Sequence, residues 1–308
     1  MENISVTEPI NLALARVRRI LFAPFDLGKW FVIGFCAWLA GLGERGVRGN
    51  YSSNSGSNNH NVDIHRQLED ARDFIRDNLY WLLPVVIAAV TIGIGLWLLF
   101  LWLNSRGKFM FLYCVALDRA EVREPWNRFG AAANSLFWFR FVVGLIGMAI
   151  VLPLVVLIIL SALPMALHDA WNFAGIMAII ALVMCMGLIG VFLFLVRKLT
   201  IDFVVPIMFL RQNRCLDAWR EFWQLLRTHS GDFVLYLLFQ IVIAIVIGVM
   251  VVAIVLVTCC IAGCLLVIPY IGTVVFLPFP VFCRSYSLYY LAQFGPAYNV
   301  FLATPPAY

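Results

Sequence analysis

Residues 233–283 read FVLYLLFQIVIAIVIGVMVVAIVLVTCCIAGCLLVIPYIGTVVFLPFPVFC and contain no Asp, Glu, Lys or Arg. Three other windows share this absence of charge: 79–105, 141–167 and 170–196. A helix needs about 20 apolar residues to cross a bilayer, so each of these three windows can hold one span and residues 233–283 can hold two. The core of a soluble domain gives no reason for uncharged runs of this length. The sequence therefore predicts a polytopic integral membrane protein.

The composition agrees with a membrane environment, and the length of the runs selects helices. Hydrophobic residues make up 63% of the chain and charged residues 13%, whereas a soluble domain carries about 25% charged residues. Lipid offers the backbone no hydrogen-bond partner, so spans are helices or strands of a closed barrel. Barrel strands are about ten residues long and alternate in polarity, which these runs do not. We expect an all-α protein with six transmembrane helices, at approximately 25–43, 80–104, 136–166, 171–196, 233–259 and 262–291.

The first apolar stretch is interpreted as a retained span. A signal peptide has a short basic region directly before its apolar core. Here the apolar stretch starts at Trp30, and acidic residues and a proline precede it: Glu2, Glu8, Pro24 and Asp26.

The distribution of Lys and Arg predicts the orientation. The N-terminal segment holds four, the connections 106–140 and 197–227 hold six each, and Arg284 adds one, which makes 17 on one side against five on the other. Cationic loops stay on the cytoplasmic side during insertion. The protein is therefore expected in the cell membrane, with both termini in the cytoplasm. The net charge of +5 then reflects topology and gives no support to nucleic-acid binding.

The connection between the first two spans has two parts. Residues 43–61 are rich in Gly, Ser and Asn, which predicts a flexible loop. Residues 63–78 place apolar side chains at helical spacing, which predicts an amphipathic helix running into the second span.

At the outer turn of the last hairpin, Cys259, Cys260 and Cys264 could form a disulfide if that face is oxidising.

A threefold repeat is suggested by arginines that end three spans. Arg106, Arg197 and Arg284 are 91 and 87 residues apart, and each precedes an apolar or aromatic continuation. Matching segments, Trp126-Asn127-Arg128-Phe129 and Trp219-Arg220-Glu221-Phe222, follow two of them, and residues 10–22, with Ile10, Leu14, Val17 and Leu21 on one face, supply a third. We predict three helical hairpins with interfacial helices in a pseudo-threefold bundle, divided as 1–107, 108–201 and 202–292, with a cytoplasmic tail at 293–308. The alternative is that hairpin-built membrane proteins share basic inner loops with aromatic neighbours.

The best candidate for a physical role is the basic and aromatic belt at the inner side. The segment 215–227 puts Cys215, Trp219, Phe222 and Leu226 on one face and charged residues elsewhere. Such a helix can lie in the interface and gather anionic lipid headgroups, although simple anchoring explains the same pattern. The candidate headgroup contacts are Arg106, Lys108, Arg128, Arg214, Arg220, Arg227, Trp126 and Trp219.

Part of the chain resembles a known family. Residues 105–112, Pro125-Trp126-Asn127-Arg128-Phe129 and residues 134–140 resemble an uncharacterised prokaryotic multi-pass membrane family. That family looks related to the membrane domain fused to some glycerophosphoryl diester phosphodiesterases. The catalytic barrel of those fusions has no counterpart here, so the resemblance supplies no catalytic residue.

The expected function follows from what the sequence holds and lacks. No catalytic, cofactor or metal-binding motif stands out, and mid-span polar residues are few, Gln240 and Thr273 among them, which argues against proton-coupled transport. Pro269, Pro278 and Pro280 are expected to break the last span. We expect a non-enzymatic protein without a cofactor that binds membrane lipids, anionic ones in particular, or organises envelope components. The alternatives are a permease or channel among the kinked spans, and an accessory subunit of a separate lipid-processing enzyme.

Overall fold

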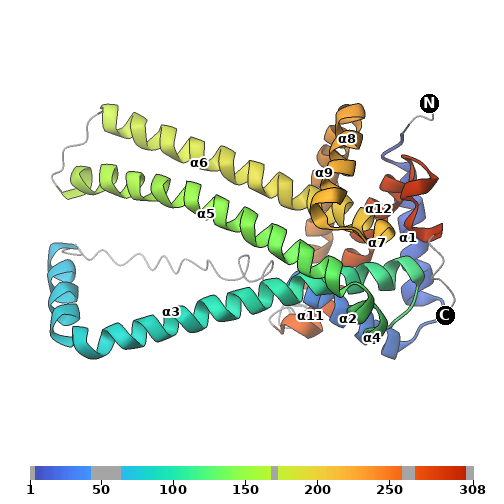
Figure 1. Cartoon of the computed structure of the whole chain (residues 1–308), viewed down its shortest axis with the longest axis horizontal. Helices are drawn as coiled ribbons and strands as arrows, with labels where there is room; N and C mark the ends of the chain where they lie inside the picture. Colours follow the sequence, from blue (N-terminus) through green and yellow to red (C-terminus); the bar gives the residue numbers. More distant parts are fainter. Residues whose placement is uncertain (1–3, 43–63, 168–172, 259–267, 303–308) are drawn as a thin grey trace. The chain divides into compact units, whose positions relative to one another are not determined.

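The computed structural model describes residues 4–42, 64–167, 173–258 and 268–302 (Figure 1). Within these ranges the secondary structure is helical and contains no strand. The predicted all-α class is thus confirmed for the described chain. The helices are α1 (Glu8–Phe22), α2 (Leu27–Gly41), α3 (Ile64–Leu117), α4 (Arg123–Arg128), α5 (Gly130–Leu167), α6 (Phe173–Leu199), the π-helix η1 (Thr200–Val204), α7 (Val205–Arg211), α8 (Cys215–Thr228), α9 (Ser230–Val257), α11 (Pro269–Val275), α12 (Pro278–Ala292), and the 3₁₀ turns Pro296–Tyr298 and Val300–Leu302.

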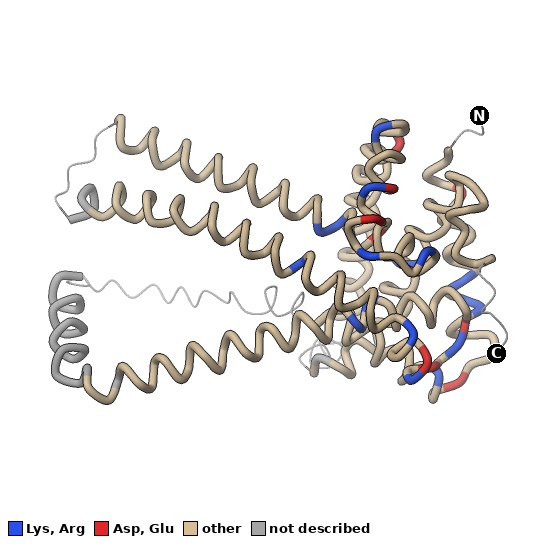
Figure 2. Tube along the Cα trace, in the orientation of Figure 1, with Lys and Arg blue, Asp and Glu red and all other residues tan. Residues whose placement is uncertain are grey.

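Four helical segments are long and apolar enough to cross a membrane. They are Leu83–Leu117, Gly130–Leu163, Phe173–Arg211 and Ser230–Val257. In Figure 2 the charged residues of α5 and α6 lie near one end of each helix, and the rest of both helices carries none. Exposed apolar surface of this extent is unfavourable in water, by about 25 cal/mol per Å². The protein is therefore built for a membrane; α2, the counterpart of the first predicted span, is a shorter apolar helix.

Two expectations about helix continuity are met. The helix predicted at 63–78 exists, since α3 begins at Ile64 and runs unbroken to Leu117. The last predicted span is interrupted, because α11 ends at Val275 and α12 begins at Pro278. Residues 43–61 and the cysteines at 259, 260 and 264 lie outside the described residues.

The chain groups into two compact units, Met1–Ala40 with Ser105–Tyr308, and Gly41–Asn104. The core of the first unit consists of the continuations that follow the three repeated arginines. Residues 107–116, 202–209 and 284–288 are buried throughout. Phe129 joins two of them, since its ring lies 5.9 Å from that of Phe109 and 4.6 Å from that of Phe209. These segments have the spacing on which the repeat was predicted; the three-hairpin arrangement itself stays a prediction.

Helix α1 packs along α12 and ties the N-terminal segment to the core. The Tyr286 hydroxyl donates to the carbonyl of Val6 over 3.1 Å. Arg16 donates to the carbonyls of Val115 and Ala116 at the end of α3, which would otherwise lack helical partners. The predicted helix over 10–22 is confirmed, and its apolar face is confirmed in part: Val17 and Leu21 are buried, but Leu14 is exposed, and the face is completed by Pro9, Ala13 and Ile20.

Candidate functional site

Helix α8 is amphipathic and anchored by one face. Cys215, Ala218 and Phe222 are buried. The Phe222 ring stacks on that of Phe203 at 5.4 Å and meets that of Phe233 edge-on at 5.3 Å. Trp219 is half-buried, and its ring lies 5.9 Å from that of Phe139 in α5. The face predicted for residues 215–227 therefore does turn toward the rest of the protein.

The three arginines predicted on α8 and at its start are all exposed. Arg220 lies 3.7 Å from Asp217, and this pair is exposed, so it stabilises little. The Arg227 guanidinium lies 5.3 Å from the centre of the Trp223 ring, within the distance of about 6 Å at which a cation–π contact forms. The Arg214 side chain makes no hydrogen bond or ion pair within the described ranges. Arg214 is thus the cation of this row that has no partner among the residues that the structure describes.

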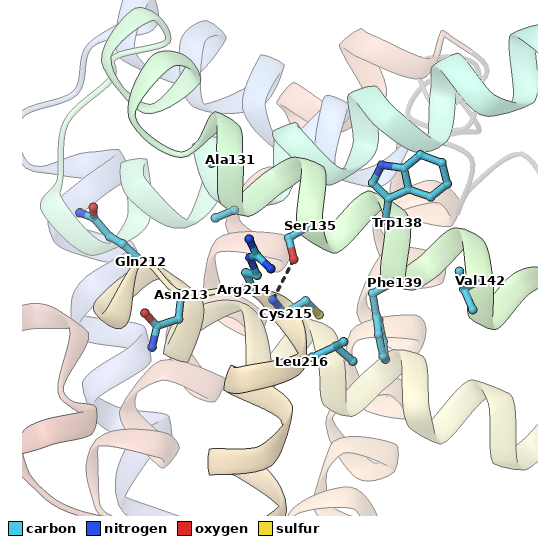
Figure 3. Close-up of a pocket in the computed structure, with 11 residues that line it drawn as sticks. Ala131, Ser135, Trp138, Phe139, Val142, Gln212, Asn213, Arg214, Cys215 and Leu216 are labelled. Carbon is cyan, nitrogen blue, oxygen red and sulfur yellow. Dashed lines mark hydrogen bonds between the residues drawn. The ribbon is translucent and has the colours of Figure 1, made fainter.

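A groove of about 620 Å³ lies where the α7–α8 turn meets α5 (Figure 3). Its polar side is the turn itself, Gln212-Asn213-Arg214, and its apolar side comes from α5 and the first turn of α8. The lining residues are Ala131, Ala132, Ser135, Trp138, Phe139, Val142, Gln212, Asn213, Arg214, Cys215 and Leu216.

Short-range bonds fix the geometry of this turn. The backbone N–H of Cys215 donates to Ser135 Oγ over 2.9 Å, the contact dashed in Figure 3. Gln212 has φ of 51° and ψ of 29°, and its N–H donates to the carbonyl of Met208 over 2.8 Å, which ends α7. A left-handed residue is a common way to end a helix. The polar side of the groove is therefore held in place before any ligand arrives.

Burial suppresses the reactivity of the thiol in the groove. Burial raises the pKa of Cys215 to about 12. The thiolate, which is the reactive form, is therefore scarce at neutral pH. The groove has no activated group for covalent chemistry at this cysteine.

A second groove, of about 540 Å³, runs along α8 itself. It is lined by Trp219, Arg220, Trp223 and Arg227, together with Leu216 and Gln224. Aromatic rings alternate here with guanidinium groups. Trp219 Nε1 is buried and finds no acceptor within the described part of the chain. This surface offers both an apolar body and positive charge to the interface.

The remaining predicted contacts divide into two kinds. Arg106 lies over the ring of Trp126 at 4.6 Å and donates to its carbonyl at 3.4 Å, so these two residues hold each other. Arg128 lies 3.8 Å from Glu124. Lys108, in contrast, is 4% exposed, because α3 continues past Arg106 into the core. The expectation that Lys108 meets headgroups is therefore not supported.

Sequence reasoning missed a buried polar network between the α6–η1 segment and α9. Lys198 Nζ lies 2.8 Å from Asp202 Oδ2, and the Tyr236 hydroxyl donates to the same oxygen over 3.0 Å. Gln240 Nε2 donates to the Tyr236 hydroxyl over 2.8 Å, and Lys198 Nζ donates to Gln240 Oε1 over 3.5 Å, which closes a ring. Both pairs, 198/202 and 236/240, have the four-residue spacing of neighbours on a helix. That spacing was the available signal.

The network lies on a π-helical turn. The N–H of Val205 donates to the carbonyl of Thr200, five residues back. Pro206 explains the widened turn, because its ring would clash with the carbonyl of Asp202 in a regular α-helix. π-turns occur frequently at functional sites. Above the turn, Arg284 Nη1 donates to the carbonyl of Ile201 over 2.6 Å.

The comparisons with known proteins add a family and no activity. Within the described ranges, no three His, Cys, Asp or Glu side chains gather as metal ligands would. No curated protein and no solved structure matches the chain. Nothing in the comparisons links the chain to glycerophosphoryl diester phosphodiesterase membrane domains. Residues 4–271 match the sequence model of a family of unknown function, so the chain belongs to the DUF7544 family.

Proposed function

We propose that this protein is a non-enzymatic, six-span protein of the cell membrane that binds anionic lipid headgroups at the inner leaflet, with both termini in the cytoplasm. The observation that carries the proposal is the exposed row Arg214, Arg220 and Arg227 on a helix whose other face is packed into the core. An interfacial helix of this kind presents its cations at headgroup level.

The size of the expected effect follows from the number of cations. Each Arg near an anionic leaflet contributes about 1 kcal/mol. Three of them contribute about 3 kcal/mol, which corresponds to roughly 100-fold in affinity. Internal pairing reduces this little, because the Arg220 pair is exposed and Arg214 has no partner among the described residues.

The position of the row relative to the spans supports the same role. Arg211, which ends one spanning segment, and Ser230, which begins the next, flank the turn and helix that carry the row. A helix between two spans is kept at the membrane surface by its connections. The excess of Lys and Arg in this connection supports a cytoplasmic location for it.

The test is lipid association of the purified protein with phosphatidylglycerol against phosphatidylcholine, measured by native mass spectrometry. Replacing Arg214, Arg220 and Arg227 with Gln should abolish the preference for phosphatidylglycerol and leave thermal stability unchanged. A matched control replaces three other exposed arginines, Arg18, Arg19 and Arg123, and changes the net charge equally. If the α8 triple variant retains its preference, or the control loses as much, α8 is an anchor only and the proposal is wrong.

A second candidate, a permease, is favoured by the polar network between η1 and α9. Asp202 is 7% exposed and charged groups of this kind inside spans often mark transport pathways. Its ring with Lys198, Tyr236 and Gln240 is closed, however, as expected of a structural network. Flux across proteoliposomes that disappears in Asp202→Asn while the fold is kept would favour the permease.

A further inference from the structure

We infer that the groove between α5 and the α7–α8 turn is a site for one glycerophospholipid, with the phosphate at Arg214 and an acyl chain along α5. The inference rests on the proposed function and narrows it from a charged surface to a single site. It commits to a lipid bearing a monoanionic phosphodiester, such as phosphatidylglycerol.

The first support is the separation of polarity within the groove. The turn contributes two amides and a guanidinium, from Gln212, Asn213 and Arg214, all exposed. The apolar side of the groove contributes Trp138 of α5, 61% exposed, and Leu216 of α8, 63% exposed. Large apolar side chains beside an exposed cation match a molecule that is itself half charged and half hydrocarbon.

The second support is the direction of the apolar wall. Trp138 and Phe139 lie three and four residues after Ser135, and Val142 lies four and three residues after them, so these side chains form one stripe along α5. With a rise of 1.5 Å per residue, the stripe is about 10 Å long. It lies within the spanning segment Gly130–Leu163. The stripe thus leads from the polar turn into the hydrocarbon region, as an acyl chain does.

The third support is the charge that remains unpaired. Arg211, next to the groove, lies 3.1 Å from Glu221, and Arg220 lies 3.7 Å from Asp217. Arg214 has no such partner within the described residues. A guanidinium binds phosphate through two parallel hydrogen bonds. The local charge is therefore complementary to a phosphodiester, and amide donors stand beside it.

The fourth support is that the site is preformed and of suitable size. The Cys215–Ser135 hydrogen bond and the left-handed Gln212 fix the turn, so little ordering is needed on binding. About 620 Å³ is typical of a small-molecule site. It accommodates the headgroup and the first part of one chain, and the rest of the lipid stays in the bilayer.

The experiment measures one-to-one lipid binding by native mass spectrometry of delipidated protein. The parent should retain one phosphatidylglycerol with saturable binding, and Arg214→Gln should weaken it at least about tenfold, as loss of a charge-assisted hydrogen bond implies. Ala131→Trp fills the groove without changing charge and should have the same effect. Arg214→Lys should bind with intermediate affinity. Thermal unfolding without lipid checks that each variant is folded, and should Ala131→Trp fail to fold, the Arg214 pair carries the test.

The controls separate binding in this groove from binding by the whole arginine row, Arg214, Arg220 and Arg227. Arg220→Gln with Arg227→Gln leaves the groove intact and should keep the single bound lipid. Lysophosphatidylglycerol should compete, and free glycerol phosphate should not, because it lacks the chain. If Arg214→Gln binds one lipid as tightly as the parent while the triple variant loses its lipid preference, the groove is not the lipid site, and the proposed headgroup binding by the arginine row of α8 stands. If neither variant changes binding, both proposals fail. Equal competition by glycerol phosphate would indicate a phosphate site and overturn the lipid assignment.

Discussion

Gly107 should tolerate no side chain, because α2 passes directly over it. A Cβ added there would lie 2.5 Å from the backbone N of Ala40, 2.6 Å from the carbonyl carbon of Leu39 and 2.7 Å from Leu39 Cβ. Two of these three atoms belong to a helix backbone and cannot rotate away. Normal carbon contacts are about 3.5–4.0 Å, so Gly107→Ala requires α2 and α3 to separate locally by about 1 Å.

The magnitude follows from two opposing effects. Overpacking costs about 1–3 kcal/mol, and a rigid backbone neighbour places Gly107 at the upper end. Replacing a helical Gly with Ala returns up to about 1 kcal/mol. Gly107→Ala should therefore destabilise the protein by about 2 kcal/mol.

The matched control is Gly187→Ala in α6, where an added Cβ meets nothing within 4 Å. It should leave stability unchanged or raise it slightly. Thermal unfolding in one detergent, followed by circular dichroism, compares the two variants. Equal midpoints for both would refute the close approach of α2 to α3.

Four further predictions concern other parts of the chain. Asp202→Asn leaves the Lys198 amine without its counterion and should lower the free energy of unfolding by about 3 kcal/mol, the lower end for a broken buried ion pair; an unchanged denaturant midpoint would show that the pair does not contribute to stability. Phe222→Ala, at a fully buried ring, should cost about 3–5 kcal/mol, and Trp223→Ala, at a 46% exposed ring, should cost far less in the same assay. Since the pKa of Cys215 is raised to about 12, maleimide labelling should stay slow from pH 7 to 9 in folded protein and become fast after unfolding; fast labelling of folded protein at pH 8 would contradict its burial. A reporter that works only outside the cytoplasm should be inactive at the C-terminus and active when inserted near Ser55, and the reverse pattern would overturn the topology.

Four of the six predicted spans correspond to long apolar helices, because lipid imposes a simple rule. An uncharged run must satisfy its backbone internally, and only a helix does so within one segment. The four long apolar helices follow from that rule. The ends were harder to predict. Lys108 was placed at the surface because Arg106 marks the end of a charge-free window, yet α3 continues to Leu117 and buries it.

The candidate site was predictable in part, for a similar reason. The amphipathic pattern of residues 215–227 is local, so α8 and its exposed arginines could be predicted from it. The groove needs Trp138 and Val142 from another helix, and its shape depends on how α5 crosses α8. The ring of Lys198, Asp202, Tyr236 and Gln240 likewise joins two helices. Helical spacing identifies the pair 198/202 and the pair 236/240 separately. It contains no information on which pairs of different helices come into contact.

The π-turn η1 has a consequence for which insertions and deletions the chain can accept. It lies inside one continuous segment, Phe173–Arg211, between α6, which buries no residue, and α7, which buries residues 205–209. One π-turn rotates the chain about as far in five residues as an α-helix does in four, so removing one residue from η1 would restore an α-helix and leave α7 in nearly the same rotational phase relative to α6. Phe209 would therefore keep its 4.6 Å stack with Phe129, whereas a residue removed from the regular part of α6 would turn α7 by about 100° and break that stack. The π-turn is thus the position at which this helix can lose one residue while its lipid-facing and core-facing halves keep their relative orientation.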